Sequence, residues 1–341
     1  MGPLYDFLIG SFEILAFLVL VSCLIFLIRR NIIQIKRFVM NEMDGWPKTD
    51  ANLILIFEVL LMSAFLLMQA ADLNLQRMGA DHYIQAGSFP VSSYFSPLFE
   101  GMHLETVYGF ERFLWWFHIL GILGFLNYLP YSKHFHIILA FPNTYYSNLE
   151  PKGSFTNMES VTKEVQMMMD PNADPYASPS EDTDESQPQR FGAKDVNDLN
   201  WVQLMNAYSC TECGRCTSEC PANQTGKLLS PRKIMMDTRD RLEEYGANLD
   251  KNGKDSHDGK FLLDDYVSRE ELWACTSCNA CTQACPLNID PLSIILDMRR
   301  YLVMEESAAP TELNMMFSNV ENNGAPWQFP AVDRLNWKDE A

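Results

Sequence analysis

Two matched runs of cysteines constrain this chain more than any other feature of its sequence. The first extends from Cys210 to Pro221 and the second from Cys275 to Pro286, and both have the spacing C-x2-C-x2-C-x3-C-P. One further cysteine, Cys23, lies alone in an apolar stretch and is expected to be a small buried hydrophobe. Cysteines gathered this densely indicate metal binding rather than a disulfide framework, and they predict a reducing compartment for this half of the chain.

The spacing of both runs is that of bacterial ferredoxins. In such a run the first three thiolates hold one iron–sulfur cubane, and the fourth, next to a proline, reaches the other cubane. The sequence therefore predicts two [4Fe–4S] clusters. Cluster one is assigned to Cys210, Cys213, Cys216 and Cys285, and cluster two to Cys275, Cys278, Cys281 and Cys220.

Two other kinds of cysteine site fit this spacing less well. Structural zinc sites use pairs of C-x2-C at wider separation, and a zinc ion needs only four ligands. Zinc would leave the third and fourth cysteines of each run unexplained. A radical-generating cluster has three ligands and an open iron, which eight matched cysteines do not offer.

The first 150 residues contain three long apolar runs, at 7–28, 51–70 and 113–129. As a helix the first run is roughly 33 Å long, which is enough to cross a hydrocarbon core of ~30 Å. Its basic residues follow the run, so a cleaved signal peptide is not expected, and the positive-inside rule places the N-terminus outside. We expect a multi-pass anchor in the inner (cytoplasmic) membrane, with the iron–sulfur part in the cytoplasm.

Two carboxyl groups, those of Glu13 and Glu58, lie inside the first two predicted spans. An ionisable group in a bilayer is costly and is a functional candidate, here for proton uptake beside a bound quinone. The alternative is a carboxyl group kept neutral by burial and hydrogen-bonded to a neighbouring helix.

Histidines near the third span are candidate haem ligands. His118 lies within the span and His136 follows it, so each could supply one axial imidazole to a haem b. The alternative is that they are interfacial histidines, hydrogen-bonded to the backbone or to lipid headgroups. The first two spans contain no histidine.

Beyond the anchor the composition changes abruptly. Residues 151–194 are predicted to be an acidic linker, because a stretch rich in Pro and Ser buries too little surface to offset the entropy lost on ordering. Within it, Val161–Met169 is a candidate helix. Residues 195–305 are predicted to form the ferredoxin domain, and 306–341 a tail whose aromatic side chains dock a partner.

The segments around the cysteine runs carry residues typical of helix ends. Helix starts are predicted at Asp198, Ser230, Ser268 and Asp290. The helix after Ser230 is expected to stop at Gly246, and the helix after Asp290 to extend to about Glu305. The predicted fold class is therefore mainly α: a transmembrane helical anchor followed by an all-α dicluster ferredoxin domain.

Charge and motif content exclude several functions. The chain has 26 Lys and Arg against 44 Asp and Glu, a formal net charge of −18 at pH 7. This balance offers no basic face to neutralise a phosphate backbone, which argues against nucleic-acid binding. The chain contains no recognisable nucleophile, acid–base pair or nucleotide loop, so bond-making chemistry is expected on a partner.

With these motifs the chain resembles the membrane-bound iron–sulfur oxidoreductases of the heterodisulfide-reductase type. These are relatives of electron-transfer-flavoprotein:menaquinone oxidoreductase and of the C subunit of anaerobic glycerol-3-phosphate dehydrogenase. The resemblance covers the third span and most of the chain after residue 190, and its most specific part is Leu129-Pro-Tyr-Ser-Lys-His134-Phe-His136. Other segments that carry it are Trp116-Phe-His118, Arg190-Phe-Gly-Ala193, Leu229-Ser-Pro, Leu272-Trp-Ala-Cys275 and Met298-Arg-Arg300.

The resemblance implies a membrane domain with haem b, then two cubanes, then cysteine-rich CCG domains with catalytic iron–sulfur chemistry. Here the membrane part is shorter, and the second span has Glu58 and no histidine to pair with His118 or His136. The chain stops at Ala341, where CCG domains would begin, so we expect them on a separate subunit docked at the tail.

Three functions are compatible with these features. The preferred one is a membrane-anchored subunit that relays electrons between a cytoplasmic flavoprotein or CCG-type iron–sulfur partner and the menaquinone pool. Two adjacent clusters favour it, because electrons can pass from one cluster to the next. One alternative is a membrane scaffold or redox sensor that recruits a catalytic partner. The other is a self-sufficient quinone reductase that uses Glu13, Glu58 and the interfacial histidines.

Overall fold

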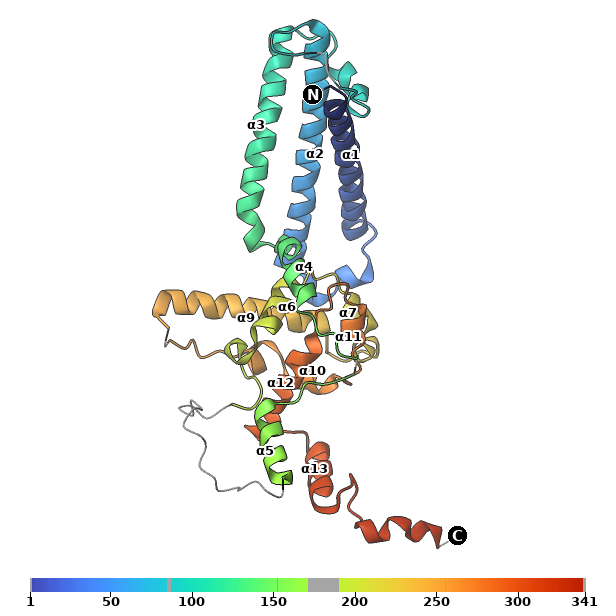
Figure 1. The fold of residues 1–341 in the computed structure, drawn as a ribbon, viewed down its shortest axis with the longest axis vertical. Helices are drawn as coiled ribbons and strands as arrows, with labels where there is room; N and C mark the ends of the chain where they lie inside the picture. Colours follow the sequence, from blue (N-terminus) through green and yellow to red (C-terminus); the bar gives the residue numbers. More distant parts are fainter. Residues whose placement is uncertain (1, 85–86, 152, 171–189, 255, 340–341) are drawn as a thin grey trace. The chain divides into compact units, whose positions relative to one another are not determined.

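The computed structural model describes residues 2–84, 87–151, 153–170, 190–254 and 256–339. These residues form mainly helices and turns, and the one β interaction among them is an isolated bridge between Leu263 and Val267. The expected fold class is confirmed, with long apolar helices first and shorter helices around both cysteine runs (Figure 1). The chain divides into two compact units: residues 1–147 with 208–218, and residues 148–207 with 219–341.

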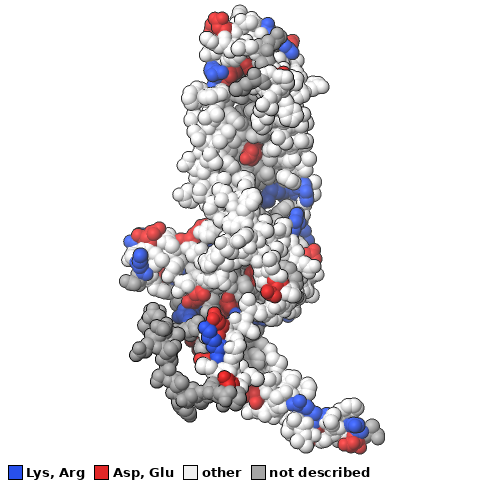
Figure 2. Space-filling model, viewed as in Figure 1, with Lys and Arg blue, Asp and Glu red and all other residues white. Residues whose placement is uncertain are grey.

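Three long helices dominate the first unit. They are α1 (Gly2–Asn31), α2 (Trp46–Met78) and α3 (Leu104–Tyr128). They lie side by side, with α2 packed against both of the others (Figure 1), and each is long and apolar enough to cross a membrane. On the face shown in Figure 2, charged side chains gather at the helix ends and the stretch between them is almost free of charge, as the interior of a bilayer requires.

Helices α1 and α2 extend beyond both ends of the apolar runs that predicted them, and α3 extends beyond its run at the start only. The predicted limits mark the stretch that fits the hydrocarbon core, whereas the helices continue into their polar flanks. The ends of α2 show what stops them. Pro47 lies in its first turn, and Gly79 ends it with a φ of 70°, a left-handed conformation that glycine adopts easily.

The loop between α2 and α3 closes one end of this unit. Its turns η3 (Ser92–Tyr94) and η4 (Ser96–Phe99) pack against α2. Asn74 of α2 donates hydrogen bonds of 2.9 Å to the carbonyl and the hydroxyl oxygen of Ser96. The buried apolar cluster at this end is formed by Ala70, Ala71, Leu75, Phe99 and Val107.

At the other end of the three helices the chain forms several short elements. They are η1 (Lys36–Phe38), η2 (Asn41–Met43), η5 (Leu129–Tyr131), η6 (Lys133–Phe135) and α4 (His136–Tyr145). Ser132 caps η6, because its hydroxyl accepts a hydrogen bond from the backbone N–H of His134. We call this region the basic end, and define it by Arg29, Arg30, Arg37 and Lys133, which line one cavity there.

Shorter helices form the second unit. They are α5 (Glu159–Met169), η7 (Val196–Asp198), α6 (Trp201–Ser209), α8 (Pro221–Gln224), α9 (Pro231–Asn252), the turn η8 (Leu262–Tyr266), α10 (Arg269–Ala274), α11 (Ala280–Ala284), α12 (Pro291–Met304), α13 (Thr311–Asn323) and η9 (Ala331–Lys338). Helices α9, α10 and α12 pack together around a core. Its fully buried side chains include Ile234, Met235, Leu272, Ile294 and Leu302.

The predicted helix starts at Ser230, Ser268 and Asp290 are confirmed. The hydroxyls of Ser230 and Ser268 accept hydrogen bonds from the backbone N–H groups of Lys233 and Glu271. The Asp290 carboxylate accepts two such bonds at the start of α12. These caps satisfy N–H groups that have no partner within their own helix.

Two other predicted helix ends are wrong. Helix α9 continues through Gly246 and ends at Gly253, whose φ is 95°. A glycine inside a helix costs only about 1 kcal/mol relative to alanine, so it does not end a helix by itself. Helix α6 begins at Trp201 rather than at Asp198, because the Asp198 carboxylate accepts N–H hydrogen bonds of 2.9 and 3.1 Å from the residues before it and stabilises the turn η7.

The predicted linker agrees with expectation in one described part and differs from it in the other. Its acidic, Pro- and Ser-rich stretch at 171–189 lies outside the described residues, and the candidate helix is present as α5. The last residues of the linker pack against α12 instead of remaining loose. The Ala193 N–H donates a 3.0 Å hydrogen bond to the Asp297 carbonyl, and a Cβ added at Gly192 would lie 2.2 Å from that same oxygen.

A buried arginine joins three segments of the second unit. The fully buried guanidinium of Arg241, on α9, pairs with Asp195 at 2.7 Å and with Asp258 at 2.6 Å. Hydrogen bonding to this guanidinium lowers the pKa of Asp258 to about 2. Asp195 also accepts a 3.0 Å hydrogen bond from the Leu262 N–H, so the pairing fixes the residues before α6 and after α9 to one point.

Candidate iron–sulfur site

The first three cysteines of the first run belong to the first unit. Cys210 and Cys213 lie on the loop between α6 and α7 (Arg215–Glu219), where Glu212 and Gly214 have φ values of 55° and 72°, and Cys216 lies in α7. These left-handed conformations make the loop turn tightly between successive cysteines. Cys210 is buried, and Cys213 and Cys216 are half-buried.

A buried ion pair joins this loop to the basic end of the helices. The Lys133 ammonium contacts the Glu212 carboxylate, and the two side chains are 10% and 2% exposed. The same ammonium donates to the Pro47 carbonyl at 2.6 Å, and the Lys133 backbone N–H donates to Asp50 at 3.1 Å. Burial lowers the pKa of Lys133, and the charge of Glu212 opposes that shift. Three segments distant in sequence therefore meet at one lysine.

The second run lies in the second unit, between α10 and α12. Cys275 interacts electrostatically with Cys278 and with Cys220, the last cysteine of the first run. Cys281 interacts in the same way with Cys275. These electrostatic interactions link the four thiols that the sequence assigns to cluster two, and the assignment itself stays a prediction.

The surroundings of these thiols combine burial with groups that stabilise negative charge. Burial opposes the free thiolates, because it raises the pKa of Cys275 and raises that of Cys281 to about 12. The Ser277 N–H donates to Cys275 Sγ at 3.4 Å, and Arg299 donates to the Cys275 carbonyl at 2.6 Å. The Arg299 guanidinium also lies 4.9 Å from the centre of the Trp273 ring. An N–H donor and a positive charge next to the sulfurs are the interactions that stabilise a bound cluster.

The chemistry of the donors indicates which group these residues fit. All of the candidate donors are thiols, which select iron–sulfur clusters or zinc. In the part of the chain that the structure describes, no three His, Cys, Asp or Glu side chains are close enough to hold a single metal ion. Four thiolates, one on each iron, are the ligand set of a cubane, and each predicted set supplies four cysteines.

The two haem candidates lie on different helices, His118 on α3 and His136 at the start of α4. His118 contacts α2, where its Nδ1 lies 3.1 Å from the Leu61 carbonyl. The Nδ1 of His136 lies 2.7 Å from the Lys133 carbonyl. Both contacts are backbone interactions of the kind that the alternative interpretation describes, and haem binding by the pair stays a prediction.

The two carboxyl groups in the spans also lie apart. Glu13 is fully buried and accepts hydrogen bonds of 3.0 and 3.3 Å from the N–H groups of Val91 and Ser92, in the loop between α2 and α3. Glu58 is half-buried and interacts electrostatically with Cys23. About 15 Å of α1 separates Glu13 from Cys23, so the two carboxyl groups do not form one site.

Sequence analysis missed Glu212, Lys133 and Arg299 as site residues. The sequence does indicate that Glu212 has a special role, because an acidic residue between two ligands of an anionic cluster needs a nearby cation. The signal for Arg299 is a basic residue on the core-facing helix that follows the second run. Neither signal identifies the partner, because both contacts join residues distant in sequence.

Sequence comparisons define the class of this site. Residues 209–289, which contain all eight cysteines of the two runs, match the family described as 4Fe-4S dicluster domain. The chain therefore carries a 4Fe-4S dicluster domain after three candidate membrane helices, and it is an iron–sulfur protein. No solved structure matches the chain significantly.

Three proteins with similar sequences indicate more closely which class of iron–sulfur protein the chain resembles. The chain is 30% identical over 370 residues to the probable iron-sulfur-binding oxidoreductase FadF of Bacillus subtilis. This alignment covers 100% of this chain and 48% of the relative. It is 28% identical over 320 residues to EtfAB:quinone oxidoreductase of Syntrophomonas wolfei, with 87% of this chain and 40% of the relative covered. A probable membrane-anchored ferredoxin of Chromohalobacter salexigens is 33% identical over 161 residues, covering 43% of this chain and 24% of the relative.

Heterodisulfide reductase subunits C and D also match parts of the chain. The resemblance stated from the sequence is therefore confirmed: this protein is similar to a probable iron–sulfur-binding oxidoreductase, to a quinone oxidoreductase, to a probable membrane-anchored ferredoxin and to heterodisulfide reductase subunits. The chain spans about half the length, or less, of the first two relatives.

Proposed function

We propose that this protein is a membrane-anchored electron-transfer protein. It holds two [4Fe–4S] clusters, each bound by the first three cysteines of one run and the last cysteine of the other. It passes electrons between a soluble partner and the quinone pool. When bound, the clusters supply one-electron carriers, and reduction of a quinone to a quinol takes two electrons and two protons.

One observation carries the proposal: the buried ion pair between Lys133 and Glu212. It holds the loop of the first cysteine run at the end of helices that are long and apolar enough to cross a membrane. Electron transfer weakens steeply with distance. A loop fixed to the end of a membrane helix is therefore well placed to deliver electrons to a lipid-soluble acceptor.

The direction of the anchor follows from charge and thiol chemistry. The basic end carries three arginines and a lysine, and the positive-inside rule places such an end in the cytoplasm. Thiolate ligands are also maintained in a reducing compartment. We propose an inner-membrane protein with its N-terminus outside and its iron–sulfur part in the cytoplasm. We assign no role to haem b, because His118 and His136 each contact a backbone carbonyl.

The relatives and the tail suggest the partners. One relative is named for EtfAB and for quinone, so we propose an electron-transfer flavoprotein or a CCG-type iron–sulfur subunit as the soluble partner, and menaquinone as the membrane partner. The tail carries exposed aromatic side chains on and around α13 and η9, namely Phe317, Trp327, Phe329 and Trp337. We propose these side chains as the docking surface for the soluble partner.

Quinone-driven reoxidation tests this function. Full-length, cluster-loaded protein in lipid nanodiscs is reduced with a limiting amount of dithionite, which bleaches the cluster absorption at about 400 nm. Adding menaquinone should restore that absorption. Protein in which Cys213 and Cys278 are both replaced by serine is the control and should show no such signal. Wild-type clusters that stay reduced with every quinone tried would overturn the proposed function.

A further inference from the structure

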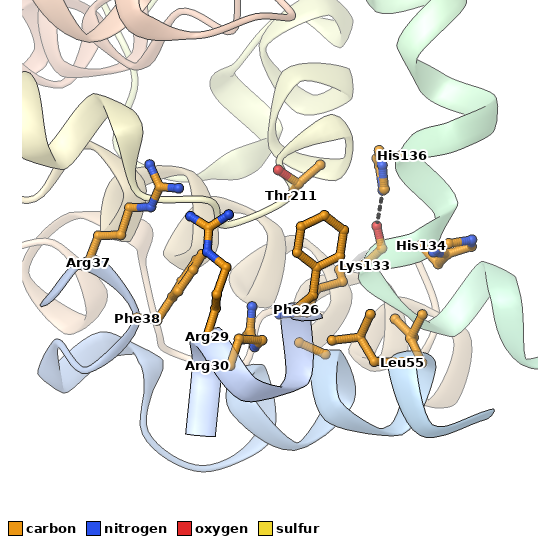
Figure 3. Close-up of a pocket in the computed structure, with 12 residues that line it drawn as sticks. Phe26, Arg29, Arg30, Arg37, Phe38, Leu55, Lys133, His134, His136 and Thr211 are labelled. Carbon is orange, nitrogen blue, oxygen red and sulfur yellow. Dashed lines mark hydrogen bonds between the residues drawn. The ribbon is translucent and has the colours of Figure 1, made fainter. Parts of the chain in front are cut away.

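A cavity of about 250 Å³ lies at the basic end, within the first unit. Its walls come from the end of α1, from η1, from the start of α2, from η6 and α4, and from the loop of the first cysteine run (Figure 3). Small-molecule sites typically begin at about 300 Å³. The cavity is therefore of a size to hold one headgroup, with any longer tail outside it.

The lining of the cavity has an apolar part and a cationic part. Phe26 and Leu55 belong to the apolar part, and both lie on helices that are candidates to cross the membrane. Arg29 and Arg37 belong to the cationic part. In the view of Figure 3, the Phe26 ring lies between the arginines on one side and the Lys133–His136 segment on the other. An amphiphile from the bilayer fits such a lining, with its polar head among the cations.

The electrostatics of the cavity favour an electron-rich headgroup. None of the described residues that line it is acidic. The nearby carboxylate of Glu212 is buried against Lys133, so it pairs with the lysine. Arg30 and Arg37 lie 4.7 and 5.1 Å from the centre of the Phe38 ring, which holds the guanidinium groups in position. Carbonyl oxygens that gain negative charge on reduction are stabilised by such donors.

The cavity shares a wall with the first cysteine run. Thr211 lines it, and Thr211 lies directly between Cys210 and Glu212. A phospholipid headgroup would not bind more tightly because the cysteine run is next to it. An electron acceptor gains a short path from the thiol ligands of cluster one, so the shared wall favours a redox-active ligand.

We propose that this cavity binds the headgroup of a quinone, with its isoprenoid tail in the lipid beside Phe26 and Leu55. This inference rests on the proposed function, because it names the site at which the quinone acts. Arg29 and Arg37 donate to the quinone oxygens, and His136, whose ring is held by its contact with the Lys133 carbonyl, forms part of the polar wall.

Binding of a fluorescent quinone analogue tests the site without relying on turnover. The analogue 2-heptyl-4-hydroxyquinoline N-oxide is titrated into cluster-loaded, full-length protein in phosphatidylcholine nanodiscs, and quenching of its fluorescence gives Kd. We expect Arg37→Gln to raise Kd about tenfold or more, because it removes a charge-assisted hydrogen bond. Leu55→Trp should raise Kd by a similar factor of about ten, because the larger side chain fills the cavity. Lys36→Gln and Leu53→Trp are matched controls, because both residues are exposed and neither lines the cavity.

Each outcome decides for or against the cavity. Equal Kd values for the wild type and both cavity variants, with unchanged cluster absorption in each, would overturn the site. A second result would also overturn the site: the analogue binds more weakly when phosphatidylglycerol replaces phosphatidylcholine in the nanodiscs, but added menaquinone does not displace it. That result identifies a lipid headgroup site. If menaquinone still reoxidises wild-type clusters in either case, the proposed function stands and only the site fails. If no quinone reoxidises them, the function itself fails.

Discussion

The ammonium of Lys133, just after the third candidate membrane helix, pairs with the carboxylate of Glu212, between the first two cysteines of the first run. Both side chains are buried, so water cannot replace either partner. Lys133 also donates to the Pro47 carbonyl at the start of α2. The pair therefore makes the position of the cysteine loop depend on the packing of two candidate membrane helices.

Removing one member of this pair should be costly. Lys133→Met leaves the Glu212 carboxylate buried and uncompensated, which typically costs about 3–5 kcal/mol. We expect a lower iron content and a lower temperature for loss of visible absorption, and Glu212→Gln should act in the same direction. The double variant Lys133→Met/Glu212→Gln should recover part of the loss, and Glu219→Gln, an exposed residue of the same run, should be neutral. A double variant no better than either single one would show that the two residues are not coupled.

The assignment of ligands predicts which cysteines act together. If the fourth cysteine of each run serves the other cluster, Cys220→Ser should damage the same cluster as Cys278→Ser, and Cys285→Ser the same cluster as Cys213→Ser. Each variant should retain about four of about eight iron atoms. EPR spectra of the reduced variants give the comparison. Matching spectra for Cys220→Ser and Cys213→Ser would mean that each run holds its own cluster.

Gly192 is predicted to tolerate no side chain. Its φ is 76°, and an added Cβ would lie 2.2 Å from the Asp297 carbonyl oxygen and 2.5 Å from the Tyr301 nitrogen. Gly192→Ala should therefore destabilise the second unit by about 3 kcal/mol or more, since backbone atoms cannot move aside easily. Gly253→Ala is the control, because its φ is also positive and its added Cβ meets no atom within 4 Å. It should cost about 1 kcal/mol, and chemical denaturation followed by visible absorption should rank the two variants in that order.

Asp237 should make stability depend on pH. Burial raises the pKa of Asp237 to about 6, despite its 2.7 Å ion pair with Lys233. The folded state therefore holds a proton that the unfolded chain releases near pH ~4. The stability from that proton is present below about pH 4 and is lost as pH rises through about 6.

The Asp237→Asn variant should remove most of this loss, about 2–3 kcal/mol, because asparagine does not titrate. Thermal loss of visible absorption at pH 5 and at pH 7 measures about half of it: the wild type should lose more stability between the two values than the variant. Asp240→Asn, an exposed neighbour on the same helix, should keep the wild-type slope. An unchanged slope in Asp237→Asn would contradict the prediction.

Local features of the fold could be predicted from the sequence, because each depends on residues close together in the chain. The caps at Ser230, Ser268 and Asp290 are examples, as are the three apolar helices. Gly246 shows the limit of local reasoning. Its effect on helix propensity is smaller than the stabilisation that α9 gains from packing on α12, so the helix continues.

The site could be predicted only as far as its ligands. The spacing of the cysteines indicates the cofactor, because the ligand pattern is local. The partners of Glu212 and Arg241 could not be predicted, because Lys133 and Asp195 are far from them in sequence and the pairing depends on the folded chain. His118 and His136 show a different case, in which two residues close in sequence lie on separate helices and contact different backbone carbonyls.

Analysis of iron and acid-labile sulfide tests the account most directly. The full-length protein is extracted from membranes with detergent and purified without oxygen. The account predicts about eight iron and about eight sulfide per chain, with no zinc at a matching ratio, and EPR signals of two interacting reduced clusters after dithionite. A preparation from the membrane fraction that holds little iron or sulfide, or holds zinc in their place, would contradict it.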